Sequence, residues 1–363
     1  MVGQTTPLRA GVIGLRRGAG FVRLLRAMDD VDLVAIADLD GDLVNRMCRD
    51  HQVQRGCGSL GELLDTNLDL VVIATPPALH VPQAVIALDA GVHVLSEVPA
   101  LGNAEECDTL ISAVERNSAQ YMLAENCCYW AFVDTARTLF ERGAFGQLFY
   151  GEAEYIHDIP QLRRDAAGDP TWRATLEPIV YCTHSLGPLL WIGGQYPVEV
   201  TCYSSGAHFD TAAPDLQTAL IKLTDGNMVR ITCSFANAHW TGHRLTLFGT
   251  RASLDTGWIG RDEPRFWSKD IPHLQAPIHL PIGTDAPGLA AAARLGGHGT
   301  AEWRMVRDFL DSIRANSRPP VDVYDAIMYS LPGLCATESA RTGRPVAIPQ
   351  YQQRRPAIAA SQA

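Results

Sequence analysis

Two short tyrosine–histidine motifs carry side chains that can do acid–base chemistry. Tyr155 and His157 are two residues apart, so in a β-strand both side chains lie on the same face. Tyr181 and His184 are three residues apart, which makes them near neighbours at the start of a helix. Histidine takes up a proton near neutral pH without help, whereas tyrosine needs a nearby cation that lowers its pKa. A single histidine is more often a hydrogen-bonded structural residue, so the chemistry depends on whether the motifs act together.

A glycine-rich turn near the N-terminus has the pattern of a dinucleotide-binding site. The apolar run Ala10–Gly14 leads into the turn, a helical segment follows, and a second apolar run, Leu33–Ala37, ends on Asp38. In this order, backbone N–H groups and the helix N-terminus meet a pyrophosphate, and the acid binds the ribose hydroxyls. Asp38 lies 24 residues beyond Gly14, close to the spacing of about 20 residues in such units.

The turn departs from the G-x-G-x-x-G/A pattern, because Arg16 stands where the second glycine belongs. Gly18 and Gly20 provide backbone freedom instead. The guanidinium groups of Arg16 or Arg17 can donate charge-assisted hydrogen bonds to phosphate. The alternative is a buried βαβ unit that binds no nucleotide. The predicted cofactor-binding residues here are Gly14, Leu15, Arg16, Arg17, Gly18, Ala19 and Asp38. We expect NAD rather than NADP, because the carboxylate of Asp38 repels a 2′-phosphate.

The composition is that of a globular protein with a sizeable core and about two domains. The 363 residues carry a formal net charge of −10 and are 47% hydrophobic. This charge argues against a surface for nucleic acid or an anionic membrane. The nine cysteines lack metal-site spacing, and the chain shows neither a secretory signal pattern nor a membrane-spanning apolar run. We therefore expect reduced thiols, no metal and a cytoplasmic location.

Strands and helices alternate in the first third of the chain, which predicts a mostly parallel sheet. The later strands are expected at Leu70–Ala74, His93–Ser96 and Gln120–Ala124, and the helices at Leu43–His51, Leu60–Thr66, Val81–Ala90 and Ala104–Asn117. Ligands of open α/β sheets bind at the carboxyl ends of the strands. The residues at those ends that we predict to join the cofactor site are Thr75, Pro76, His80, Glu97, Pro99, Glu125 and Asn126.

After about residue 130, β-rich runs follow one another without intervening helices, which predicts an antiparallel sheet covered on one face by helices. The expected strands are Gly146–His157, Pro197–Ser205, Thr218–Leu223, Met228–Phe235 and Arg244–Gly249, and the expected helices are Phe132–Arg142, Thr183–Ile192 and Glu302–Ala315. A polar loop, Gln161–Glu177, is expected near the cleft. The fold class is thus α/β, with a Rossmann doubly wound parallel sheet in residues 1–126 and an α+β domain with a mostly antiparallel open sheet in residues 127–363.

The sequence resembles the Gfo/Idh/MocA oxidoreductases over nearly its whole length. The matching segments are GVIGLRRGAG with ADLD, ATPPALH, HVLSEVPA and AEN in the first half, and YCTHSLGP, GGHGTAEW and PPVDVYDA in the second. The resemblance implies an NAD(P)-dependent enzyme that transfers hydride between the nicotinamide and a ring hydroxyl of a carbohydrate or related polyol.

One departure from the family concerns proton transfer. The family's dehydrogenases usually carry Glu-Lys-Pro, with the lysine as acid/base, whereas this chain has Glu97-Val98-Pro99. Valine cannot exchange a proton, and neither Lys222 nor Lys269 lies in a comparable motif.

The sequence is most similar to the branch of NAD-dependent glycoside hydrolases typified by α-N-acetylgalactosaminidases, which carry EVP-like triplets. Their site pattern is matched by Glu125, Tyr155, His157, Tyr181 and His184. The resemblance implies that these five side chains line the sugar pocket beside the nicotinamide, with the two Tyr/His pairs as catalytic residues and Glu125 in contact with substrate. His184 or Tyr155 then takes the place of the missing lysine.

Three further residues are predicted to bind substrate. Trp172 can stack on a sugar and Arg173 can donate a fork of hydrogen bonds to it, or both can simply anchor the loop. His298 either hydrogen-bonds ligand or lies in a loop before a helix.

Three functions remain open from the sequence. The first is an NAD-linked oxidoreductase acting on a small carbohydrate. The second is a redox-neutral glycosidase in which oxidation at C3 acidifies the C2 proton, elimination expels the aglycone, and water addition and re-reduction complete the cycle. The third is a non-catalytic nucleotide-binding sensor. In each case we expect no nucleic-acid or membrane partner, and a homodimer or homotetramer formed through the open sheet face.

Overall fold

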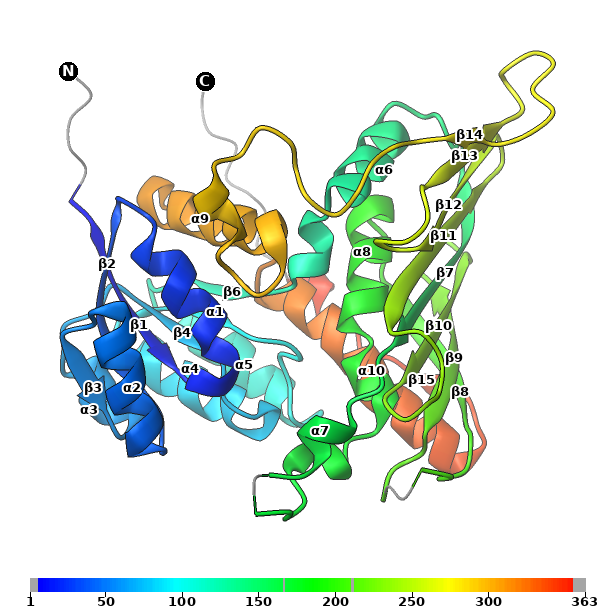
Figure 1. The fold of residues 1–363 in the computed structure, drawn as a ribbon. Helices are drawn as coiled ribbons and strands as arrows, with labels where there is room; N and C mark the ends of the chain where they lie inside the picture. Colours follow the sequence, from blue (N-terminus) through cyan, green and yellow to red (C-terminus); the bar gives the residue numbers. More distant parts are fainter. Residues whose placement is uncertain (1–5, 166, 210–211, 355–363) are drawn as a thin grey trace.

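The computed structural model describes residues 6–165, 167–209 and 212–354 of the chain. Two sheets, one in each half of the sequence, form the framework of the molecule (Figure 1). The first is a parallel sheet of six strands and the second a mostly antiparallel sheet of nine. This arrangement confirms the predicted fold class.

The first sheet has the strand order β3-β2-β1-β4-β5-β6, which is that of the doubly wound dinucleotide-binding fold. Its strands are β1 (Leu8–Ile13), β2 (Val31–Ala37), β3 (Arg55–Cys57), β4 (Leu70–Ile73), β5 (His93–Ser96) and β6 (Tyr121–Leu123). All four residues of β4 are buried, as expected for a strand covered on both faces. The sequence analysis missed β3, because three residues that include an arginine and a glycine carry no strand signal.

Five helices accompany this sheet: α1 (Leu15–Arg26), α2 (Gly41–His51), α3 (Leu60–Leu64), α4 (His80–Asp89) and α5 (Glu106–Glu115). α1 packs against α2, and α4 packs against α5. The side chains of Asp40 and Ser59 accept hydrogen bonds from the first turns of α2 and α3, as N-caps do.

The second sheet has the order β14-β13-β12-β11-β7-β10-β9-β8-β15. Its strands are β7 (Leu148–Ile156), β8 (Pro197–Ser204), β9 (Leu216–Leu223), β10 (Met228–Ser234), β11 (Gly242–Gly249), β12 (Ala252–Trp258), β13 (Arg265–Ser268), β14 (Ile278–His279) and β15 (Val346–Ala347). Among these strands, β7 and β10 pair in parallel and the other neighbours are antiparallel. The sequence analysis missed β12 to β15, because β12 contains residues rare in strands and the other three are very short.

Helices cover one face of the second sheet. α8 (Thr183–Gly193) packs on β7, α10 (Val323–Thr342) packs on β8, and α6 (Ala131–Glu141) packs on α8. The sequence did not predict α10 as one long helix, since Pro332 interrupts the helical pattern. Asp322 caps its start by accepting N–H groups of Tyr324 and Asp325. The expected loop at 161–177 contains the single-turn helix α7 (Pro160–Arg163).

Helix α9 (Gly299–Ala315) returns from the second half of the chain to the first sheet, where Figure 1 shows it beside α1. Arg307 and Arg314 of α9 both bind the carboxylate of Asp30, at 2.7 and 2.8 Å. Glu302, in the first turn of α9, also binds Arg17 at the start of α1, so a late segment of the chain borders the glycine-rich turn.

The other face of the second sheet exposes large apolar side chains, among them Leu220, Met228 and Phe248, which are 43%, 38% and 38% exposed. Within the described ranges, no helix has both the length and the apolar character required to cross a bilayer.

Candidate active site

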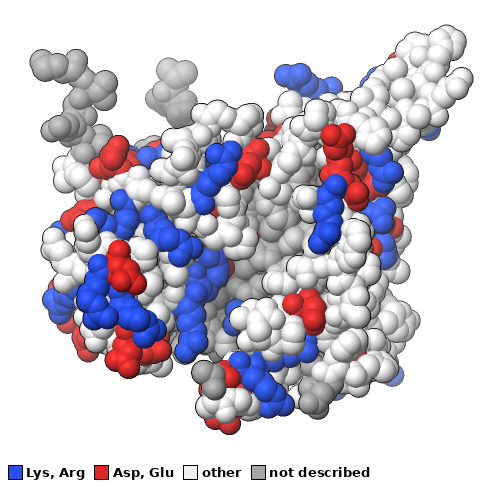
Figure 2. Space-filling view, in the orientation of Figure 1, with Lys and Arg blue, Asp and Glu red and all other residues white. Residues whose placement is uncertain are grey.

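A cavity of about 180 Å³ lies where the carboxyl ends of the first sheet face the second half of the molecule. Figure 2 shows the hollow between the two halves, with basic side chains along the wall formed by the first. Polar lining residues are Arg17, Glu97, Asn126, Tyr155, His157, Arg173, Tyr181, His184 and His298, and apolar ones are Val98, Ile159, Leu162, Leu176 and Phe235. The fold thus brings both Tyr/His motifs to one cavity, together with residues of the EVP and EN strand ends.

Tyr155 and His157 project from the end of β7 on the same face of the strand. The hydroxyl of Tyr155 is 2.8 Å from Nδ1 of His157. Burial raises the pKa of Tyr155 well above its usual value, and the charges of Tyr181 and Cys127 act in the same direction. Burial also lowers the pKa of His157, as does the positive charge of His184. Tyr155 is therefore a proton donor near neutral pH, and His157 is a neutral acceptor.

Glu125 and His184 form a buried hydrogen-bonded pair at the cavity. Nδ1 of His184, at the start of α8, is 2.8 Å from Oε1 of Glu125, just after β6. Burial by itself lowers the pKa of His184, but the charge of Glu125 and its hydrogen bond outweigh burial and raise that pKa above 6.5. The other ring nitrogen, Nε2, makes no hydrogen bond to the described residues, and His184 lines the cavity.

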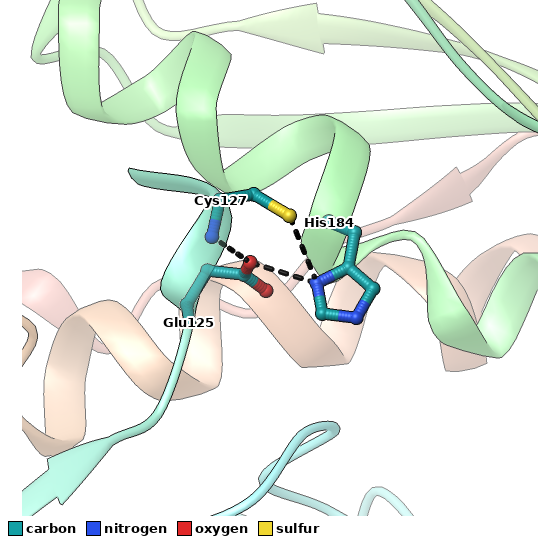
Figure 3. Close-up of side chains that lie close together, drawn as sticks. All are labelled: Glu125, Cys127 and His184. Atoms are coloured by element: carbon teal, nitrogen blue, oxygen red, sulfur yellow. Dashed lines mark hydrogen bonds and ion pairs between the residues drawn. The ribbon is translucent and has the colours of Figure 1, made fainter. Parts of the chain in front are cut away.

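Cys127 joins this pair, as Figure 3 shows. Its backbone N–H donates to Oε1 of Glu125 at 3.1 Å, and its Sγ lies 3.4 Å from Nδ1 of His184. The three side chains offer potential metal-ligand atoms within 4.8 Å of one another. The sequence did not indicate this cluster, because His184 is far from the other two residues along the chain. The hydrogen bonds between the three residues account for their proximity without an ion.

Tyr181 connects the second half of the molecule to the EVP turn. Its hydroxyl donates to the backbone carbonyl of Val98 at 3.0 Å. Burial raises the pKa of Tyr181 to about 12, and the charge of Glu97 adds to this rise. Tyr181 therefore places a neutral phenol against the backbone of Val98, the residue that stands where the family's dehydrogenases carry their lysine.

Arg17 links three parts of the site instead of pointing only at a phosphate. Its guanidinium lies 2.6 Å from Oε1 of Glu97 and 2.7 Å from Oε1 of Glu302, in the first turn of α9. Nδ1 of His298 is 3.3 Å from the same guanidinium. Glu302 is fully buried, and the sequence analysis did not single it out, because a glutamate at a helix start is ordinary. With two carboxylate partners, Arg17 joins the segment after β5 to the start of α9 in the cavity wall.

The glycine-rich turn is shaped for close approach of the backbone. Gly14 has φ +88°, and a Cβ there would lie 2.5 Å from the carbonyl of Ala74, so no other residue fits. Gly18 lets α1 approach β1, because a Cβ at Gly18 would lie 2.7 Å from the side chain of Val12. Gly18, rather than Ala19, thus has the packing role of the third glycine.

Asp38 contacts the turn directly. Its carboxylate accepts the backbone N–H groups of Leu15 at 2.7 Å and Asp40 at 3.0 Å. Arg16 is exposed, with its guanidinium 3.8 Å from the carboxylate of Asp40. The acid is therefore held at the edge of the turn, where the fingerprint places the ribose.

Thr75, Pro76, His80 and Pro99 form the rim of the first sheet and do not line the cavity. His80 is 1% exposed, with its ring nitrogens 2.7 Å from the carbonyl of Thr75 and 2.8 Å from that of Pro99. Burial lowers the pKa of His80. Through these contacts His80 connects the segments that follow β4 and β5, which is a structural role.

Trp172 and Arg173 have different positions. Arg173 lines the cavity, whereas Trp172 does not. The guanidinium carbon of Arg173 lies 4.1 Å from the ring centroid of Trp172. The tryptophan thus supports the arginine.

The sequence analysis also missed His243, on β11. Its ring stacks on that of Tyr155, with centroids 4.3 Å apart and planes 10° from parallel. Trp130 meets the edge of the same imidazole at 5.0 Å. His243 belongs to no motif, so only strand pairing reveals it.

Three family models match successive parts of the chain. The model described as "Oxidoreductase family, NAD-binding Rossmann fold" matches residues 8–125, the "GFO/IDH/MocA C-terminal domain" matches residues 133–255, and the "Glycosyl hydrolase 109, C-terminal domain" matches residues 288–355. The first two models together match more than half of the chain.

Relatives and solved structures agree with these matches. A glycosyl hydrolase family 109 protein of Saccharopolyspora erythraea is 26% identical, over 96% of this chain and 84% of its own. The α-N-acetylgalactosaminidase of Tannerella forsythia is 28% identical, over 82% of this chain and 75% of its own. Levoglucosan dehydrogenase with NADH superposes with a TM-score of 0.82 at 19% identity, covering 95% of this chain and 100% of the other. For myo-inositol 2-dehydrogenase of Lactobacillus plantarum the TM-score is 0.76 at 21% identity, with the same coverage. At these identities the two structures show the fold alone.

Proposed function

The chain belongs to the Gfo/Idh/MocA oxidoreductases, and on that premise we propose that it transfers hydride between a nicotinamide cofactor and a ring hydroxyl of a carbohydrate. The observation that carries the proposal is the Glu125–His184 pair, which faces a cavity at the carboxyl ends of the Rossmann strands. Oxidation of a hydroxyl needs a base for the proton, and this pair supplies one at the position where the fold directs a nicotinamide.

The residues present fit NAD. The N–H groups of Gly14 and Leu15 are donated to Ala37 and Asp38, so the pyrophosphate would be met by the next N–H groups in the first turn of α1, those of Arg16 and Arg17. Asp38 favours an adenosine ribose without a 2′-phosphate. Nδ2 of Asn126 is buried in the cavity wall and has no hydrogen-bond partner among the described residues, so it is ready to bind a polar group of the cofactor or substrate. When bound, NAD supplies hydride exchange.

His184 is the proposed base. With Nδ1–H donated to Glu125, the neutral ring presents an unprotonated Nε2 to the substrate hydroxyl. The raised pKa of His184 strengthens it as a proton acceptor, and Glu125 stabilises the imidazolium that forms. Tyr155, Tyr181 and His157 position the sugar as hydrogen-bonding groups, and Tyr155 donates rather than accepts because its pKa is raised.

A redox-neutral glycosidase is the second candidate, favoured by the glycosyl hydrolase 109 match at residues 288–355. In this cycle C3 of the sugar is first oxidised, which acidifies the proton on C2. Removal of that proton expels the aglycone from C1, water adds across C1 and C2, and C3 is reduced again. His157 and Tyr155 would then be the second proton-transfer pair, since their hydrogen bond joins an acceptor to a donor.

One experiment separates these functions. The purified protein is incubated with free sugars and with aryl glycosides, with and without added NAD. Accumulation of NADH in proportion to sugar consumed supports the oxidoreductase. Aglycone release without net NADH contradicts it in favour of the glycosidase. If NAD binds but no substrate reacts, a nucleotide-dependent sensor is the remaining function.

We also propose that copies of this chain assemble as a homodimer or homotetramer through the open face of the second sheet. The exposed Leu220, Met228 and Phe248 support this, because monomers seldom leave such faces uncovered. A cytoplasmic location is proposed from the cysteines, all nine of which are free thiols. Sedimentation of wild type and of Phe248→Glu tests the assembly.

A further inference from the structure

We propose that Arg173 selects substrates bearing a single carboxylate, so that the carbohydrate is of the hexuronic acid class. The inference rests on the proposed oxidoreductase function and concerns the part of the sugar that is not oxidised. The feature that carries it is an arginine in the cavity wall that has no acidic partner among the residues that the structure describes.

Arg173 is held in place by its own short turn. The hydroxyl of Thr171 accepts the backbone N–H of Arg173 at 3.3 Å. The guanidinium lies over the face of Trp172, with 4.1 Å from its central carbon to the ring centroid. A guanidinium that stacks on an aromatic face keeps its in-plane N–H donors free for another ligand. The turn therefore holds the guanidinium of Arg173 in one orientation, with its N–H donors available to a ligand in the cavity.

The other charges of the cavity wall are already paired. Arg17 lies between Glu97 and Glu302, and Glu125 binds His184. Within the described parts of the chain, Arg173 has no carboxylate within 4.0 Å. Among the described charged groups of the wall, Arg173 is thus the cation that no carboxylate neutralises directly.

The charge of Arg173 acts inside the cavity. It opposes the burial that raises the pKa of Tyr181 to about 12. It also adds to the burial and to the charge of His184 that lower the pKa of His157. Since both residues belong to the two Tyr/His pairs, a substrate that contacts these pairs lies within the field of the arginine.

One unpaired guanidinium is matched by one carboxylate. Arginine binds carboxylates through two parallel hydrogen bonds, and the charge assistance makes these bonds strong. A phosphate monoester carries about −1.5 to −2 charges at neutral pH and would leave negative charge uncompensated here. A neutral sugar would leave the guanidinium without a charged partner in the cavity. The cavity of about 180 Å³ is also smaller than the ~300–1,000 Å³ typical of larger ligands, which suits a single sugar ring.

The test compares acids with their neutral counterparts in the full-length protein. D-galacturonate and D-glucuronate are assayed for NAD reduction beside D-galactose and D-glucose. Calorimetry of the NAD-loaded protein measures the affinity for the same four sugars and for galactose 6-phosphate, so that binding is recorded whether or not turnover occurs. We expect the acids to bind at least about 10-fold more tightly than the neutral sugars.

Two variants localise the effect. Arg173→Gln removes the guanidinium in the cavity, whereas Arg164→Gln removes a guanidinium from the same loop whose contact is the backbone carbonyl of Gly168. We expect the acid-to-neutral affinity ratio to fall about 10- to 100-fold in Arg173→Gln and to remain at the wild-type value in Arg164→Gln.

The outcomes separate the two proposals. Equal or tighter binding of the neutral sugars, or tighter binding of galactose 6-phosphate, overturns the carboxylate assignment, and NADH formed from the neutral sugars then leaves the oxidoreductase intact. Selective binding of the acids without NADH from any sugar supports the assignment and overturns the oxidoreductase. A ratio that falls equally in both variants also overturns the role of Arg173.

Discussion

The imidazole of His243 stacks face to face on the phenol of Tyr155, with ring centroids 4.3 Å apart. The two residues are paired across β7 and β11. His243 is partly buried, and the burial of its ring lowers its pKa well below the usual value, as do the charges of His184 and His157. The neutral imidazole of His243 therefore fixes the orientation of the Tyr155 ring, which faces the cavity.

The stack predicts that His243 positions Tyr155. In His243→Leu we expect kcat to fall about 2- to 10-fold, the range given by the energy of an aromatic pair, while the Kd for NAD stays at its wild-type value. His243→Phe keeps an aromatic face and should recover most of kcat. A loss of equal size in the Leu and Phe variants, with reduced thermal stability in both, would show that the residue only fills space.

The Glu125–His184 pair predicts a shifted pH dependence. His184 must be neutral to accept a proton, and its raised pKa keeps the protonated form populated above pH 6.5. The value of kcat/KM for sugar oxidation should therefore fall as the pH drops through this raised pKa. In Glu125→Gln the carboxylate no longer opposes the effect of burial, so the pKa of His184 should be lower. The fall of kcat/KM in acid should then occur at lower pH. A fall at unchanged pH would mean that another group is the base.

Removal of the base itself should affect turnover more than cofactor binding. In His184→Ala we expect kcat to fall by about 10²- to 10⁴-fold, the usual contribution of a general base, with NAD affinity within about 2-fold of wild type. Fluorescence titration of NAD and steady-state kinetics measure the two quantities. A large loss of NAD affinity with unchanged kcat would contradict the assigned role.

Asp38 predicts the choice between NAD and NADP. Asp38→Asn retains an acceptor for the N–H of Leu15 but removes the negative charge that opposes a 2′-phosphate. We expect the affinity for NADP relative to NAD to rise at least about 10-fold. Asp42→Asn, at an exposed site in the first turn of α2, is the control. Equal changes in both variants would assign the effect to overall charge.

Glu302 predicts a specific loss of stability in acid. Burial by itself raises its pKa, but the hydrogen bond from His298 and the charge of Arg17 outweigh burial and hold the pKa at about 2. A carboxyl whose pKa is lower in the folded state stabilises the fold above its unfolded pKa of 4.5 and loses this contribution as the pH falls to about 2.

Urea unfolding at several pH values tests this contribution. A shift of this size corresponds to about 3 kcal/mol, so the free-energy gap between wild type and Glu302→Gln should shrink by up to that amount in acid. Asp89→Asn, which removes an exposed partner of Arg116, should show little such change. A gap between wild type and Glu302→Gln that does not depend on pH would contradict the ion-pair explanation.

The sequence by itself determined the Rossmann half of the fold. The β-turn-α-β order, Gly14 and the buried β4 are local signals, because backbone conformation and burial on both faces constrain adjacent residues. It also predicted both Tyr/His pairs, since spacing within one strand or one helix start fixes which side chains are neighbours.

The tertiary structure alone decided how these pieces meet. His243 reaches Tyr155 through strand pairing, Glu302 reaches Arg17 because α9 returns to the first sheet, and Cys127, just after β6, reaches His184 at the start of α8. It also decided that Arg173, and not Trp172, lines the cavity. Each contact joins residues far apart in the chain, and such contacts depend on the packing of whole elements rather than on any local spacing of residues.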